Sequence, residues 1–489
     1  MDYKFSLHAG EIGTYDWGSL LIRFASLAKV LPGTAAELMA GAVVGNATWK
    51  TGAELRGYIA FLHEFIHYIQ DMYTSLGHWD YLVRREYTPI MLDHARYFSW
   101  VSGPGLPYPS AKLKAKASPE ISKHVKGFET DLSQMHNKLT YIPVGDVSDK
   151  RSELILKYMR SLETPVPLSS GDEEPYTIKS LLEAEAAAMV YIQLRGLKMS
   201  DEQWEIAKDH LSLYTPGAMS EMYSGTIRSV LQVLEYKFDT NVDEDSTWSD
   251  FISRFTMLLT VFLVDLACAY PSPDQLKSDK SREEYEPGIR FMRLLRAFQI
   301  LVGKKTINDF IKAIHNEKYE KAESYLLQDC EFPYPRAIDI YKKWFVYYDK
   351  MEIPSENPVL SFRKNCLKQR VKNYDYFVFK TPFLLTERTH LYWITPNGIE
   401  SLGSSADYFD LDIKRRYFGE FLAQNKDWAL VNFFLGSGKF VCPLAEARLC
   451  DAATPTCLSG IQKPEQFPPA PGCVVRRGLE DAEFSLASH

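Results

Sequence analysis

Residues 52–76 read GAELRGYIAFLHEFIHYIQDMYTSL, and this stretch decides the fold of the chain. Thr51 and Glu54 make a capping-box pattern at its start, in which each side chain can satisfy a backbone N–H of the first turn. Gly77 indicates the end of the helix, because glycine is the residue that most often follows a helix end. The pattern therefore predicts one long helix from about residue 52 to residue 76.

Within this predicted helix lies the pentad His63-Glu64-Phe65-Ile66-His67. Residues four apart stand on the same face of a helix, so the two imidazoles can hold one zinc ion between them. Glu64 follows the first histidine and can reach a water molecule bound to that ion. The pentad predicts a zinc site with His63 and His67 as ligands and Glu64 as general base.

A zinc ion held by two histidines needs a third protein ligand and an open position for water. Residues 68–72 read YIQDM, without the glycine and third histidine that one branch of such proteins places there. We therefore expect a carboxylate from a later helix. The predicted helix from Thr177 to about Arg195 is nearly all apolar, yet it contains Glu183 and Glu185.

The start of that later helix leaves two alternatives for the third ligand. If it starts at Ser180, the Ser-x-x-Glu pattern makes Glu183 a capping residue, and Glu185 becomes the better ligand. If Thr177 is the cap, both acids lie inside an apolar helix, where metal binding would offset the cost of burying a carboxylate. We favour Glu183 and keep Glu185 as the alternative.

Residues 63–71 read HEFIHYIQD, which resembles the HExxHxxxD pattern of thermolysin-like members of the gluzincin zinc metallopeptidases. Residues 181–186, LLEAEA, are similar to the third-ligand helix of several of these families, and Glu183 takes the place of the ligand. The resemblance implies that Asp71 orients a zinc-binding histidine without binding the ion itself.

The resemblance implies hydrolysis of an amide bond with Zn²⁺ as the cofactor, which activates water and polarises the scissile carbonyl. Glu64 would take a proton from the water and hand it to the leaving amine. A further donor would stabilise the oxyanion, and His210, Tyr214 and Tyr223 are candidates downstream of the ligand helix.

The expected fold is mainly α (α+β), with a zincin-like metalloprotease core. We expect a catalytic domain over residues 1–270 with an insertion at about 103–175, a helical domain over 271–375 and an α/β region over 376–489. The insertion could cover the active site. Further helices are predicted near 201–213, 219–237, 247–270, 288–302 and 306–328. Strands are predicted at 376–379 and 390–394, with a turn at 396–398.

Cys442, Cys450, Cys457 and Cys473 fall within 32 residues, at intervals of seven, six and fifteen. No Cys-x-x-Cys knuckle is present, so a zinc ribbon is not matched. The four thiols can still close around a second zinc ion or an iron–sulfur cluster, and a metal would supply folding energy to this loop-rich tail. Disulfides and independent thiols are the alternatives.

The composition of the chain limits the kinds of partner and the cellular compartment that we expect. The net charge is −7 over 489 residues, which argues against a general nucleic-acid binder. The longest apolar run, residues 255–264, is too short to span a bilayer and predicts a buried helix. Residues 1–5 show no secretion-signal pattern, and seven cysteines suit a reducing compartment, so we expect a cytoplasmic protein.

The expected function is therefore cleavage of a protein or peptide substrate, with a regulatory protein partner as a further expectation. Two rival hypotheses follow from the same residues. The pentad can hold a structural zinc in a non-catalytic interaction module, or the zinc enzyme can hydrolyse a non-peptide amide.

Overall fold

The computed structural model describes these residues: 13–16, 21–24, 52–82, 176–196, 199–212, 221–238, 246–270, 272–273, 287–316, 318–328, 334–350, 358–374, 392–395, 398–401, 440, 442, 445, 450, 452–462, 466–469 and 472–481.

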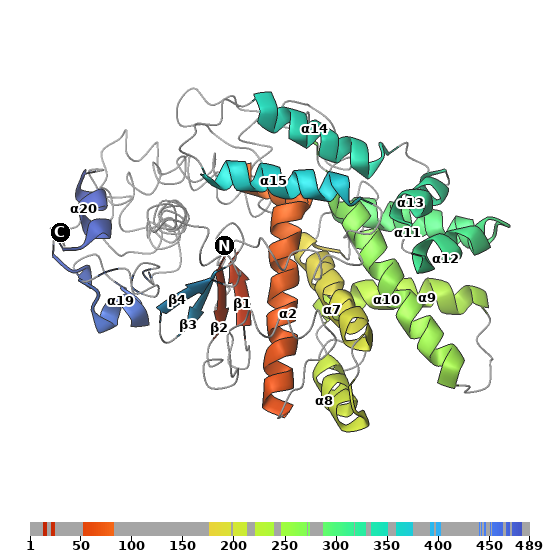
Figure 1. Cartoon of the computed structure of the whole chain (residues 1–489), viewed down its shortest axis with the longest axis horizontal. Helices are drawn as coiled ribbons and strands as arrows, with labels where there is room; N and C mark the ends of the chain where they lie inside the picture. The colour runs from red at the N-terminus through yellow and green to blue at the C-terminus, as the bar shows by residue number, and fades with distance from the viewer. Residues whose placement is uncertain are drawn as a thin grey trace, which may run out of the picture.

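Helices dominate this part of the chain, as the sequence predicts (Figure 1). They are α2 (Gly52–Tyr73), α7 (Ile178–Gly196), α8 (Asp201–Ser212), α9 (Glu221–Phe238), α10 (Ser246–Cys268), α11 (Pro287–Val302), α12 (Ile307–His315), α13 (Tyr319–Leu327), α14 (Ala337–Lys350), α15 (Pro358–Lys372), α19 (Pro455–Ser459) and α20 (Val474–Asp481). The single helix predicted over 306–328 is two, α12 and α13. A mainly α fold is confirmed.

The helix that carries the pentad, α2, begins at Gly52 as predicted but ends three residues early, at Tyr73. Thr51 lies outside the described residues. Helical geometry resumes at Ser75 and continues to Leu82, so Gly77 does not end the helix. A Cβ atom on Gly77 would lie 1.9 Å from the Asp71 carbonyl oxygen, which is far inside contact distance. Glycine is therefore needed for a close backbone approach at this break, and not for a stop.

The break after α2 is held by a buried cation from α15. The Arg363 guanidinium donates to the backbone carbonyls of Asp71 and Gly77, at 2.9 and 3.2 Å. It also forms an ion pair with the Asp71 carboxylate, at 2.7 Å. A side chain from a segment nearly 300 residues away in the sequence thus bonds the backbone on both sides of the break.

Helix α7 starts with a reciprocal cap that settles its first turn. The Ser180 N–H donates to Thr177 Oγ1 at 3.0 Å, and the Thr177 N–H donates to Ser180 Oγ at 2.9 Å. Thr177 is therefore the capping residue, and Glu183 lies inside the helix rather than at its cap. Four alanines between residues 184 and 188 leave room for α2, α9 and α10 to pack closely against α7.

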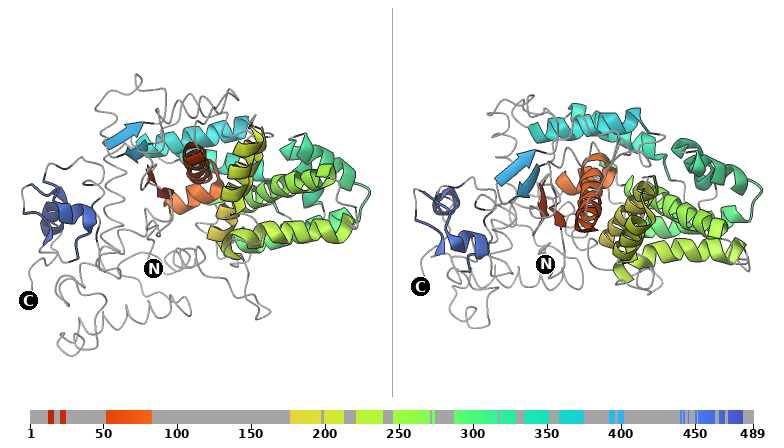
Figure 2. Two further views of the ribbon diagram at one scale, coloured as in Figure 1. Left: turned by 90° about the horizontal axis from the view of Figure 1, so that it is seen from below. Right: turned by 60° about the horizontal axis from the view of Figure 1, so that its bottom comes forward.

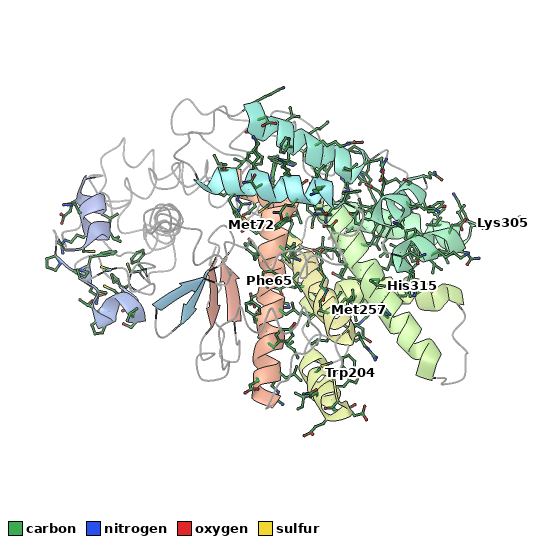
Figure 3. The ribbon with its side chains drawn as sticks, viewed as in Figure 1. Phe65, Met72, Trp204, Met257, Lys305 and His315 are labelled. Atoms are coloured by element: carbon green, nitrogen blue, oxygen red, sulfur yellow. The ribbon has the colours of Figure 1, made fainter. Side chains whose placement is uncertain are left out.

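One cluster of buried apolar side chains runs from Leu55 to Tyr374, so α2 and α7 through α15 share a single core. This core includes residues on both sides of position 270, where the sequence predicts the end of the catalytic domain. Phe65 and Met257, labelled in Figure 3, belong to it. The apolar run predicted to be a buried helix lies in α10, where every residue from 255 to 264 is buried. Among the described residues, no helix is long and apolar enough to cross a membrane.

A four-stranded sheet packs beside α2, on the side away from α7 (Figure 2). Its order is β1 (Gly13–Asp16), β2 (Leu21–Phe24), β3 (Tyr392–Thr395) and β4 (Gly398–Ser401), with a parallel pairing of β2 and β3. The predicted strand at 390–394 overlaps β3, which pairs antiparallel with β4, and residues 396 and 397 of the predicted turn lie outside the described residues. The predicted strand at 376–379 and the insertion at 103–175 lie outside the described residues.

Candidate metal centre

Two adjacent helices bring the predicted ligands together. His63 and His67 lie one turn apart on α2, and Glu183 lies on α7, which packs against α2. Among the described residues, this is the only group of three or more His, Cys, Asp or Glu side chains whose ligand atoms lie within 4.8 Å of one another. All three side chains are buried.

The distances within this group suit a tetrahedral ion. The Nε2 atoms of His63 and His67 are 3.1 Å apart, and they lie 2.9 and 3.3 Å from Glu183 Oε2. Zinc bonds of about 2.0–2.1 Å at tetrahedral angles would separate ligand atoms by about 3.3–3.4 Å. Two nitrogens and one carboxylate oxygen are also a donor set that zinc prefers, so the residues present fit the ion.

Without a metal, the same atoms form a buried ion pair. Burial opposes a charge on His67, but the Glu183 carboxylate outweighs it and raises the pKa of His67 to about 9. Burial favours the neutral form of Glu183, yet His67 and His63 hold the pKa of its carboxyl well below the usual range. A proton thus occupies the place that a metal would take, and metal binding must displace it.

Gln70 fixes the orientation of one histidine. Its Nε2 donates to the Leu182 carbonyl and to Glu185 Oε2, both at 2.9 Å. Its Oε1 therefore faces His67 Nδ1, at 2.7 Å, and accepts the hydrogen from that nitrogen. When His67 is neutral, Nε2 is then the atom that carries the lone pair, and it points at Glu183. Hydrogen bonds of this kind set the tautomer of metal-ligating histidines.

Glu185, the alternative third ligand, lies on the far side of Gln70 from the histidines. Its carboxylate accepts from Gln70 rather than facing His63. Burial, together with the nearby charge of Asp265, raises the pKa of Glu185 to about 8. The structure thus brings Glu183, and not Glu185, to the two histidines.

Glu64 follows His63 on α2 and is almost fully buried, with 9% of its surface exposed. Its carboxylate is close enough to His67 to contribute, after Glu183, to the raised pKa of that imidazole. The predicted general base therefore lies beside the predicted ligands.

Gln70 contacts His67, and the neighbouring Asp71, for which an orienting role is predicted, contacts Arg363. Asp71 lies four residues after His67, but its carboxylate pairs with Arg363 on α15. Gln70, three residues after His67, is the side chain that contacts the imidazole. The contact with His67 that the structure shows therefore comes from Gln70, which the sequence pattern did not single out.

The remaining predicted donors are not tested. His210 and Tyr223 fall on α8 and α9. Their side chains, like the whole of Tyr214, lie outside the described part of the chain. Their roles at an oxyanion stay predictions.

A second buried polar group, centred on Asp265, lies near Glu185. Asp265 on α10 forms a buried ion pair with Arg370 on α15 and accepts a hydrogen bond from the Tyr319 hydroxyl, at 2.7 Å. The Arg370 guanidinium also lies over the Tyr341 ring, 5.0 Å from its centroid. An acid in an apolar helix is usually explained by a buried salt bridge, and the structure confirms this for Asp265, whose partner is 105 residues away.

Comparison with known proteins gives no relative: no family model, no curated protein and no solved structure matches this chain.

Proposed function

We propose that this protein is a zinc-dependent metallopeptidase with a zincin-like core, which cleaves a protein or peptide. One observation carries the proposal: the ligand atoms of His63, His67 and Glu183 meet within 3.3 Å of one another, from two buried helices. Glu64 lies next to the first of these ligands.

Three protein ligands leave the fourth position of a tetrahedral site open, which is the arrangement of catalytic rather than structural zinc. When bound there, zinc would supply a Lewis acid that polarises a carbonyl and lowers the pKa of water. The residues of the chain then have distinct tasks. His63, His67 and Glu183 hold the ion, and Gln70 keeps His67 in the ligating tautomer.

Glu64 is the residue that moves the proton. It accepts a proton from the attacking water and delivers it to the leaving amine, because the neutral amine is the better leaving group. Its burial supports this role, since a shielded carboxylate has fewer solvent waters competing for the same proton. General acid–base catalysis of this kind contributes about 10²–10⁴-fold to a rate.

The test is the isosteric variant Glu64→Gln. Wild type and variant are incubated with a peptide library made from a whole-cell protein digest, and new termini are identified by mass spectrometry. We expect cleavages with wild type that disappear with Glu64→Gln, while zinc content and thermal unfolding stay the same. Glu54→Gln is the matched control, since Glu54 lies near the start of α2, about 15 Å from Glu64 by helical rise, and its change should leave cleavage intact.

The two rival functions predict different outcomes of the same experiment. A non-catalytic interaction module would show no cleavage with any variant, although it keeps its zinc. A hydrolase for non-peptide amides would cleave small amides in a Glu64-dependent way but leave the peptide library intact. Either result would overturn the peptidase proposal.

A further inference from the structure

The C-terminal unit, which we define as the described residues between 440 and 481, contains four of the seven cysteines of the chain. It lies beyond the sheet from α2 (Figure 1), and none of its residues belongs to the core cluster that runs from Leu55 to Tyr374. It is built around one short antiparallel bridge, in which Phe440 and Ile461 exchange two backbone hydrogen bonds of 2.7 Å.

The cysteines occupy the inside of this unit. Cys442, Cys457 and Cys473 are buried, and Cys450 is half-buried. The Cys442 N–H donates to the Cys457 carbonyl at 3.1 Å, which places these two residues side by side. Cys450 and Cys457 lie close enough to Cys473 to interact with it electrostatically. Residues from three separate turns are thus gathered at one place.

Two of the sulfur atoms accept backbone hydrogen bonds. The Thr454 N–H points at Cys457 Sγ, at 3.5 Å, and the Arg476 N–H points at Cys473 Sγ, at 3.4 Å. These bonds hold the two sulfur atoms at fixed positions on the backbone around them. In each case the donor lies three residues from the cysteine, so the local turn itself directs the N–H toward sulfur.

We propose that Cys442, Cys450, Cys457 and Cys473 hold a structural zinc ion through four thiolates. No three of these sulfur atoms, all of which the structure describes, lie within 4.8 Å of one another. Zinc–sulfur bonds of about 2.3 Å would draw them to separations of about 3.8 Å. Metal binding therefore tightens a unit whose backbone already brings the four residues together.

The size of the unit is the physical reason for a metal. It spans residues 440–481, close to the size of about 40 residues below which a small fold usually needs disulfides, a metal or a partner subunit. Its described buried apolar side chains are few: Phe440, Ala445, Ile461, Phe467, Val475 and Leu479. A zinc site of four thiolates would add binding free energy directly to folding.

The experiment uses the full chain in the His63→Ala/His67→Ala background, so that the pentad contributes no metal and the result does not depend on the proposed function. The protein is purified without oxygen, and zinc is counted by elemental mass spectrometry. We expect one zinc per chain, lost when Cys457→Ser/Cys473→Ser is added. Cys268→Ala/Cys366→Ala is the matched control, because it removes two buried thiols of the helical core and should keep the zinc.

A second measurement leaves the four cysteines intact, in case the serine variant fails to fold. Zinc is replaced by cobalt(II) in the same background, and the expected result is intense near-ultraviolet absorption from thiolate-to-cobalt charge transfer. Cobalt absorption without that band would overturn the proposal. A background protein without zinc, a disulfide among the four cysteines, or iron with inorganic sulfide would each overturn it as well.

Discussion

The side-chain oxygen of Gln70 lies 2.7 Å from Nδ1 of His67, and this contact decides which nitrogen of the imidazole faces Glu183. The amide of Gln70 cannot turn over, because its nitrogen is already engaged by the Leu182 carbonyl and by Glu185. The helix that supplies Glu183 therefore also orients His67, through a residue that touches no metal.

Gln70→Leu should weaken zinc binding. The change keeps the size of the side chain but removes the acceptor for His67 Nδ1, and loss of such a partner costs about 10–100-fold in metal affinity. Competition with a fluorescent zinc chelator measures the affinity. Gln193→Leu is the control, since it makes the same change in a buried glutamine on α7, about 15 Å along the helix from Glu183. Equal affinities in the two variants would contradict the role of Gln70.

Glu183→Gln and Glu185→Gln should differ sharply, although the residues are two apart on α7. Glu183→Gln removes a carboxylate that lies 2.9 and 3.3 Å from the two histidines, so zinc should be lost on dialysis. Glu185→Gln changes a carboxyl that contacts Gln70, and the zinc should remain. Zinc content after dialysis distinguishes them, and retention in Glu183→Gln with loss in Glu185→Gln would reverse the assignment.

Zinc affinity should rise with pH between about 7 and 9. The pKa of His67 in the metal-free protein is about 9, so below that value zinc must displace a proton from the imidazole. Displacement of one proton predicts an increase of about tenfold in affinity for each pH unit. Calorimetry in buffers of different ionisation enthalpy counts the protons released, and an affinity that does not change over this range would contradict the ion pair.

The ion pair between His67 and Glu183 also predicts how the stability of the metal-free protein depends on pH. The pKa of His67 is raised from 6.5 to about 9, so its contribution is complete below pH 6.5 and is lost as the pH rises through 9. The pKa of Glu183 is lowered from 4.5, so its contribution is present above pH 4.5 and is lost as the pH falls. The melting temperature in a chelator should therefore decline from pH 6.5 to pH 9, and His67→Gln should show a weaker decline.

Arg363→Met should destabilise the fold by about 3–5 kcal/mol, because it leaves the buried carboxylate of Asp71 without its cation. Lys364→Met is the control on the next residue of α15. Lys364 pairs with Asp349 at the surface, and such pairs contribute about 0–1 kcal/mol. The free energy of unfolding in urea measures both changes. If Arg363→Met lowers the free energy of unfolding by no more than the control does, the contacts of Arg363 at the break after α2 are not needed for stability.

Local sequence was enough to predict the helix of the pentad and the two histidines. Spacings of four residues and capping patterns are short-range, so α2 and the position of the two histidines on one face of it could be predicted without any knowledge of the rest of the chain. Glu183 could also be predicted as a candidate ligand, since an acid in an apolar helix needs a partner. The choice between Glu183 and Glu185 required the distances from each carboxylate to the two histidines, which local sequence does not give.

The partners of buried charges could not be predicted in the same way. Arg363 follows Asp71 by 292 residues, and Arg370 follows Asp265 by 105. Nothing in the local pattern of either acid shows which distant cation packs against it. For the same reason the contact of Asp71 with Arg363 and the break after Tyr73 could not be predicted, because both involve a cation from α15.

The most direct test of the account is the zinc content of wild type and of His63→Ala/His67→Ala, measured by elemental mass spectrometry on purified, dialysed protein. We predict that the variant contains one zinc ion fewer per chain than wild type, while it keeps its helical content by circular dichroism. Equal zinc in the two proteins would mean that His63, His67 and Glu183 hold no metal, and the metallopeptidase proposal would fall.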